Sequence, residues 1–264
     1  MPSCELTGHR GARGLRPENT LPGFSYAVSL GVDTVELDVM LTADGAVVVT
    51  HDSRLNPDIA RTPGGAWLVP PTPAVRELTL SELRRTDVGR ARPGSETAKN
   101  FPRQVACDGA WIPLLTEVLA LGAELDIELK TRPDDPDSCD PAALAAAVLA
   151  LLGNARPALR SFDFRGLRHV RARRPDLPIA YLTRSAGAAG LRSVLAEAPR
   201  PGDAWGPAHD TVSPELVAAA HARGVLVKAW TVNRPEDAAR LVAWGVDGIC
   251  TDDPGSVGPV LARA

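Results

Sequence analysis

Short β-prone runs alternate with helical stretches along most of this 264-residue chain, and this alternation limits the possible folds more than any other feature. It is typical of a parallel sheet wrapped by helices. Eight such units predict one α/β domain over residues 1–264, a closed (β/α)8 TIM barrel. The expected barrel strands are Glu5–Gly8, Thr34–Asp38, Glu124–Lys130, Leu159–Phe162, Pro178–Leu182, Ala204–Gly206, Val225–Trp230 and Gly248–Thr251. The expected helices are Leu21–Leu30, Asp140–Leu152, Gly166–Arg173, Ala186–Ala196, Pro214–Ala222 and Pro235–Trp244.

A β-hairpin is expected directly after the second strand. The pair Asp44-Gly45 separates two β-prone runs and is a strong short-range hairpin signal. A two-residue loop would place Ala43 opposite Ala46, and the same register would pair Asp38 with His51. A bulge in the turn would shift this register by one residue. The hairpin therefore predicts an acid and a histidine together at the rim of the second strand.

Residues 52–113 interrupt the alternation. They are rich in proline and glycine, and one short helix is expected near Leu80–Thr86. A structureless loop of this length is unusual inside a compact domain. The segment is therefore interpreted as an inserted cap over one end of the barrel, contributing to the wall of the site.

Composition excludes several classes of protein. The net charge of −3 provides no broad basic surface for nucleic acid. The most apolar stretch, Ala142–Leu152, is too short to span a bilayer, so no stable membrane association is expected. The first residues do not resemble a signal peptide, and the four cysteines are dispersed. Both features favour a cytoplasmic protein with reduced thiols.

Polar residues gather where the expected barrel strands end, which is where active sites of this fold lie. Glu36 and Asp38 are two apart on one strand, so they share a face, as do Glu128 and Lys130 on the next. Taken singly, each has an ordinary structural explanation as a rim charge, an ion pair or a core residue. Their convergence at one rim favours catalysis. The set comprises His9, Arg10, Glu36, Asp38, His51, Glu128, Lys130 and Trp230.

These residue types suit metal-assisted cleavage of a phosphate ester. Three converging carboxylates repel one another unless a cation neutralises them. A hard divalent ion with oxygen ligands, Mg²⁺ or Ca²⁺, meets that requirement. Two histidines can supply a general base and a general acid, while an arginine and a lysine stabilise charge on the phosphoryl group.

The order of the motifs resembles the glycerophosphodiester phosphodiesterase family, a member of the phospholipase C-like phosphodiesterase barrels. The resemblance runs from about residue 4 to residue 255, and its strength lies in eight pieces in order rather than in any one of them. They are His9-Arg10-Gly11, Pro17-Glu18-Asn19-Thr20, Glu36-Leu37-Asp38, His51-Asp52, Glu128-Leu129-Lys130, Ser161-Phe162-Asp163, Trp230-Thr231-Val232-Asn233 and Gly245-Val246-Asp247-Gly248 with Thr251-Asp252.

The resemblance implies an enzyme that hydrolyses glycerophosphodiesters to glycerol 3-phosphate and an alcohol, with one divalent cation. It implies His9 and His51 as the general acid/base pair. It also implies metal ligands (Glu36, Asp38, Glu128), phosphate or glycerol contacts (Arg10, Lys130, Trp230) and supporting residues (Glu18, Asn19).

Two other functions compete with this interpretation. A lysophospholipase D or sphingomyelinase D-like enzyme would use the same residue types on a lipid, beside an accessible apolar groove. A non-catalytic phosphate-binding barrel would not need two histidines placed for proton transfer. The sequence leaves open the metal, the alcohol and the oligomeric state. It also leaves open whether water or a glycerol hydroxyl attacks phosphorus, the latter giving a cyclic phosphate.

Overall fold

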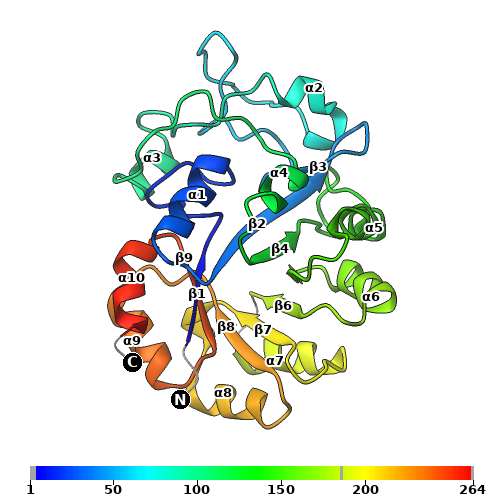
Figure 1. The fold of residues 1–264 in the computed structure, drawn as a ribbon, viewed down its shortest axis with the longest axis vertical. Helices are drawn as coiled ribbons and strands as arrows, with labels where there is room; N and C mark the ends of the chain where they lie inside the picture. The colour runs from blue at the N-terminus through cyan, green and yellow to red at the C-terminus, as the bar shows by residue number, and fades with distance from the viewer. Residues whose placement is uncertain (1–3, 185–186, 263–264) are drawn as a thin grey trace.

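Eight parallel strands close into a barrel in the computed structural model, which describes residues 4–184 and 187–262. Closure occurs because β1 pairs with both β9 and β2 (Figure 1). The predicted (β/α)8 barrel is therefore confirmed. Its strands are β1 (Glu5–Gly8), β2 (Thr34–Leu41), β4 (Leu125–Leu129), β5 (Ala158–Ser161), β6 (Ile179–Thr183), β7 (Ala204–Pro207), β8 (Leu226–Ala229) and β9 (Gly248–Thr251).

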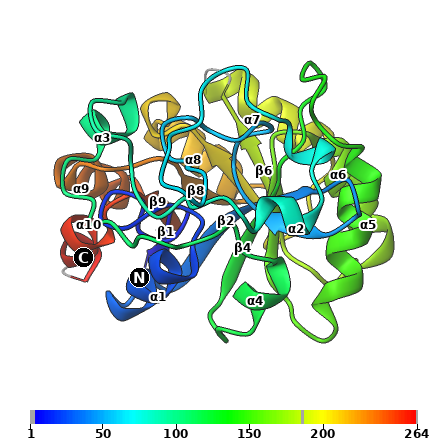
Figure 2. The same ribbon diagram turned by 90° about the horizontal axis from the view of Figure 1, so that it is seen from above.

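Helices cover the outside of the barrel (Figure 2). Several begin at residues whose chemistry starts a helix. For α8, the Ser213 side chain accepts a hydrogen bond from the backbone N–H of Leu216, and Pro214 occupies the first turn. The principal helices are α1 (Leu21–Ser29), α5 (Pro141–Leu152), α6 (Phe164–Arg173), α7 (Gly187–Ala196), α8 (Pro214–His221), α9 (Pro235–Ala243) and α10 (Pro254–Leu261).

The expected helices are present with small shifts at their ends. Among the described residues, three further α-helices were not predicted, namely α10, the short α4 (Leu115–Leu119) and the short α3 (Glu96–Asn100). Ala186, the expected first residue of one helix, lies outside the described residues. Within the described ranges, no helix combines the length and apolar character needed to cross a membrane.

The hairpin after β2 is present, but the predicted register is wrong by one residue. The second arm, β3 (Val47–Val49), pairs antiparallel with β2, with Val39 opposite Val49. The backbone carbonyl of Asp38 accordingly accepts a hydrogen bond from the backbone N–H of Thr50, and Asp38 does not pair with His51. The loop has three residues instead of two, and Gly45 takes the positive φ of +78° that such a bulged turn requires. His51 still follows the arm directly.

Residues 52–113 form a long excursion beyond the hairpin (Figure 1). This segment contains a 3-10 turn (Val75–Glu77), α2 (Leu80–Leu83) and α3 (Glu96–Asn100), so the predicted helix ends before Thr86. It packs on a hydrophobic cluster separate from the main core. That second cluster consists of Met40, Val48, Leu55, Ala60, Val75, Leu83, Val88 and Ile112. Because Met40 and Val48 belong to the hairpin, the hairpin joins the barrel to this segment.

Candidate active site

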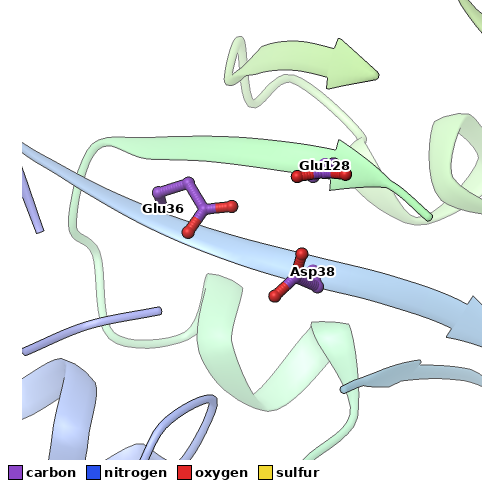
Figure 3. A group of neighbouring side chains, drawn as sticks. All are labelled: Glu36, Asp38 and Glu128. Atoms are coloured by element: carbon purple, nitrogen blue, oxygen red, sulfur yellow. The ribbon is translucent and has the colours of Figure 1, made fainter. Parts of the chain in front are cut away.

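Three carboxylates from two neighbouring strands converge inside the rim of the barrel (Figure 3). Glu36 and Asp38 lie on β2, and Glu128 lies on β4 directly beside Asp38 in the parallel register. Each offers an oxygen within 4.8 Å of the others, and all three are buried. Burial raises the pKa of Glu36 well above its ordinary value, and the negative charge of Asp38 adds to this effect. The cluster therefore carries more negative charge than its surroundings stabilise.

Two cations offset part of that charge. The Lys130 ammonium lies 2.8 Å from a Glu128 oxygen and 3.0 Å from an Asp38 oxygen. The Arg10 Nε lies 3.3 Å from Asp38, while its Nη1 donates to Glu18 at 2.8 Å. Burial alone would raise the pKa of Asp38, but the charges of Lys130, His51 and Arg10 hold it well below its usual range. This excess of carboxylate oxygens matches the donor set that a hard divalent cation prefers.

Glu18 and Asn19 support this cluster from behind. Glu18 accepts hydrogen bonds from Arg10 and Arg13. The Asn19 amide donates to Asp38 at 2.9 Å and its oxygen accepts the Asp38 backbone N–H at 3.3 Å. The two residues therefore hold Arg10 and Asp38 in position.

His9 is held from one side by a buried carboxylate. Its Nδ1 lies 2.6 Å from Asp252, and its Nε2 lies 4.0 Å from Glu36. The side chain of Asn233 donates to the second Asp252 oxygen at 2.7 Å. Burial lowers the pKa of His9, although the Asp252 charge opposes that effect. A neutral His9 with Nδ1 occupied presents Nε2 to the carboxylate cluster.

His51 is held in the same way at the opposite side. Its Nδ1 lies 2.6 Å from Asp52, and Asn56 donates to the other oxygen of Asp52 at 2.8 Å. Burial would raise the pKa of Asp52, but its bond to His51 and the histidine charge bring it to about 2. Both histidines therefore have one ring nitrogen fixed and the other available.

One cavity of about 230 Å³ joins these groups, and its lining includes His9, Arg10, Glu36, His51, Glu128, Lys130 and Trp230. Its far wall is aromatic. The Trp230 ring meets the Phe162 ring edge-on at 5.2 Å, and its Nε1 donates to the Gly206 carbonyl. The Arg184 guanidinium lies 3.9 Å over the other ring, that of Phe162. The structure thus brings the two histidines, the carboxylates and the cations to one place.

Several residues of this site were not assigned a place from sequence. Asp52 and Asp252 stand in motifs of the resemblance, but nothing local shows that they hold the histidines. Asp252 is 243 positions from His9, so only the closed barrel brings them together. Arg184 carried no signal, because it follows β6 at a point where no motif stands.

Comparison with known proteins agrees with this geometry. A model of the "Glycerophosphoryl diester phosphodiesterase family" matches residues 9–256. The chain is 34% identical over 259 residues to a glycerophosphodiester phosphodiesterase of Caldanaerobacter subterraneus subsp. tengcongensis, covering 94% of each protein. It is 30% identical to a glycerophosphodiester phosphodiesterase of Bacillus subtilis, covering 93% of this chain and 82% of that one.

Solved structures give the same result. A candidate glycerophosphoryl diester phosphodiesterase of Silicibacter pomeroyi superposes with a TM-score of 0.91 at 37% identity, covering 100% of this chain and 95% of that one. An Oleispira antarctica phosphodiesterase, solved with the product sn-glycerol-3-phosphate, shares the fold with a TM-score of 0.77 at 23% identity, covering 98% and 97%. The chain belongs to the glycerophosphoryl diester phosphodiesterase family.

Proposed function

We propose that this protein hydrolyses glycerophosphodiesters to glycerol 3-phosphate and an alcohol, by a reaction that needs one divalent cation and two histidines. The observation that carries the proposal is the single cavity in which His9 and His51 face the carboxylate cluster. Relatives at 30% identity or more bear the name of this activity. The Oleispira antarctica phosphodiesterase was solved with the corresponding product.

In this proposal the two histidines move the protons. One takes a proton from the attacking oxygen, and the other gives a proton to the departing alcohol oxygen. Asp252 and Asp52 keep the Nδ1 of each ring occupied, so Nε2 carries out the transfer. The attacking oxygen is either that of water or that of a neighbouring glycerol hydroxyl. Detection of a cyclic glycerol phosphate by ³¹P NMR during turnover would identify the second route.

The charged groups stabilise the phosphoryl oxygens. Arg10 and Lys130 are buried side chains beside the cavity, and a positive charge acts more strongly there than in open water. A Mg²⁺ or Ca²⁺ ion held by Glu36, Asp38 and Glu128 would neutralise negative charge on the phosphoryl group. Trp230 and Phe162 form an apolar wall against which the carbon chain of glycerol can pack.

The size and lining of the cavity support a small polar substrate over a lysolipid. The cavity measures about 230 Å³, and its apolar wall of Phe162, Leu182 and Trp230 faces histidines, arginines and carboxylates, which suits a glycerol unit better than an acyl chain. The two histidines on one cavity likewise support catalysis over phosphate binding alone. We propose that the whole chain acts as one domain, with residues 52–113 as a cap beside the site.

Release of glycerol 3-phosphate from glycerophosphoethanolamine, glycerophosphocholine and glycerophosphoglycerol tests the proposal. We expect release with Mg²⁺ or Ca²⁺, loss of release with EDTA, and recovery when the metal is restored. Metal-independent release would contradict the assigned role of the carboxylates. No release from any glycerophosphodiester, with release from a lysophospholipid, would overturn the substrate class.

A further inference from the structure

A second cavity, of about 240 Å³, adjoins the one that holds the carboxylates. His51 and Lys130 line both cavities, whereas His9, Glu36, Glu128 and Trp230 line the first alone. A phosphodiester centred in the first cavity, with its glycerol against the aromatic wall, therefore has its other ester arm directed past His51. Through its contact with both spaces, His51 is placed to protonate the alcohol that leaves in that direction.

We infer that the second cavity is the alcohol subsite and that it selects a small zwitterionic alcohol, one with a primary ammonium and a carboxylate. This inference rests on the proposed function and adds the class of leaving group to it. Asp135 would bind the ammonium and Arg132 the carboxylate.

The walls of this cavity are held in place before any substrate arrives. One wall follows His51, and the other is the loop 132–138 after β4. The Arg54 side chain joins them, because its Nε donates to Asp137 at 2.6 Å and its Nη1 donates to the Thr72 carbonyl. Arg76 reaches the same Asp137 carboxylate at 3.4 Å. The subsite therefore has a fixed shape rather than one that forms around its ligand.

Most charges that line the cavity already have partners. The carboxylate oxygens of Asp52 bond to His51 and Asn56, and Arg54 pairs with an acid of the facing loop. Lys130 pairs with the carboxylate cluster of the first cavity. These groups shape the cavity, but they are not available to recognise a charged alcohol.

Arg132 and Asp135 are the exceptions. In the described ranges, no acid lies within 4.0 Å of the Arg132 guanidinium, and no basic group lies within 4.0 Å of the Asp135 carboxylate. Among the described residues, the Asp135 carboxylate accepts a hydrogen bond only from the backbone N–H of Asp137, at 2.9 Å. Arg132 is exposed and Asp135 is half-buried, and the two side chains line the same space without pairing with each other, so a ligand that carries both charges can meet one positive and one negative group there.

The lining also disfavours other alcohols. The described lining includes no phenylalanine, tyrosine or tryptophan, so a quaternary ammonium would lack the aromatic cage that usually binds such groups. A primary ammonium can instead donate hydrogen bonds to Asp135 and to the nearby hydroxyls of Ser53 and Thr72. Choline is therefore expected to be a poorer leaving alcohol here than serine.

The test compares kcat/KM for glycerophosphoserine, glycerophosphoethanolamine and glycerophosphoglycerol, with metal present. We expect glycerophosphoserine to be cleaved best. Arg132→Gln should lower its kcat/KM about tenfold and leave the other two substrates unchanged, since one charge-assisted contact is lost. Asp135→Asn should lower kcat/KM about tenfold for the serine and ethanolamine substrates, but not for glycerophosphoglycerol.

Glu124→Gln is the control for loss of a negative charge, because Glu124 is exposed just before β4 and lines neither cavity. It should change none of the three values. If all three substrates are cleaved but both cavity variants affect them equally, or not at all, the subsite assignment is wrong while the proposed function stands. If none is cleaved, the proposed function fails and the subsite fails with it.

Discussion

Each of the two histidines is fixed through Nδ1 by an aspartate that an asparagine holds in turn. Removing either imidazole should leave the surrounding groups in place and remove one proton transfer. We expect His9→Ala and His51→Ala each to lower kcat by about 10²–10⁴-fold or more, the usual contribution of a general acid or base. Circular dichroism and thermal melting should show an intact fold. A variant with near wild-type kcat would contradict the catalytic role of that histidine.

The carboxylate cluster gives a prediction that does not depend on turnover. Glu128→Gln keeps the shape of the side chain but removes a charge from the cluster, so the affinity for Mg²⁺ or Ca²⁺ should fall, as measured by calorimetric titration. Glu124→Gln is the control, because Glu124 is exposed just before the same strand. Equal affinities for the two variants would show that Glu128 is not a ligand.

At the scale of residues, spacing along a strand could be read from the sequence and contacts across the barrel could not. Glu36 and Asp38 are two residues apart on one strand, so the geometry of a strand alone places their side chains on the same face. The place of Asp252 beside His9 depends on the pairing of β9 with β1, the first and last strands. The place of Arg184 in the site follows only from its position over the Phe162 ring, which the sequence does not show.

At the scale of elements, the barrel strands were predictable because β-prone runs and proline or glycine boundaries recur in the same order. The hairpin register was not. The pair Asp44-Gly45 suits loops of two or three residues, and the choice depends on hydrogen bonds between Thr42 and Ala46 that no local signal reveals. Within residues 52–113, the short helix at Leu80–Leu83 was expected and is present, whereas α3 (Glu96–Asn100) was not foreseen.

The turn of this hairpin should be sensitive to a side chain at one position. Gly45 has a φ of +78°, and an added Cβ would meet nothing within 4 Å, so Gly45→Ala tests backbone strain alone. We expect a loss of about 1 kcal/mol in the free energy of unfolding, measured with urea. Gly64→Ala, where φ is not positive and an added Cβ would make an ordinary contact with the Thr62 hydroxyl at 3.9 Å, should cost far less. Equal effects would contradict a bulged turn.

At the scale of the whole molecule, the contact that joins the two ends of the barrel should affect stability in acid. Burial would raise the pKa of Asp252, but His9 and its hydrogen bond lower it from 3.8 to about 2. A carboxyl whose pKa is lower in the folded state than in the unfolded state stabilises the fold at pH values above its unfolded-state pKa. That stabilisation is lost as the pH falls through the folded-state pKa. This contribution is therefore present above about pH 4 and absent below about pH 2.

Urea unfolding of the wild type and Asp252→Asn between pH 6 and pH 2 measures that contribution. The difference in the free energy of unfolding between the two proteins should shrink by about 2 kcal/mol over this interval. Asp253→Asn cannot replace it as a control, because Asp253 caps α10. Asp134→Asn is suitable, since that side chain is exposed on the loop after β4. A difference that stays constant with pH would contradict the pKa shift of Asp252.

His51 and one wall of the second cavity lie in the segment that follows the hairpin and packs on the second hydrophobic cluster, whereas His9, the carboxylates and the other wall lie on the barrel. We expect the second cluster to open at a lower free energy than the main core, because it contains far fewer buried residues. Opening it would separate the two histidines and dismantle the alcohol side of the site together. Heat inactivation of this enzyme would then precede melting of the barrel and would be reversible on cooling, because the unopened barrel remains as a template for reclosing.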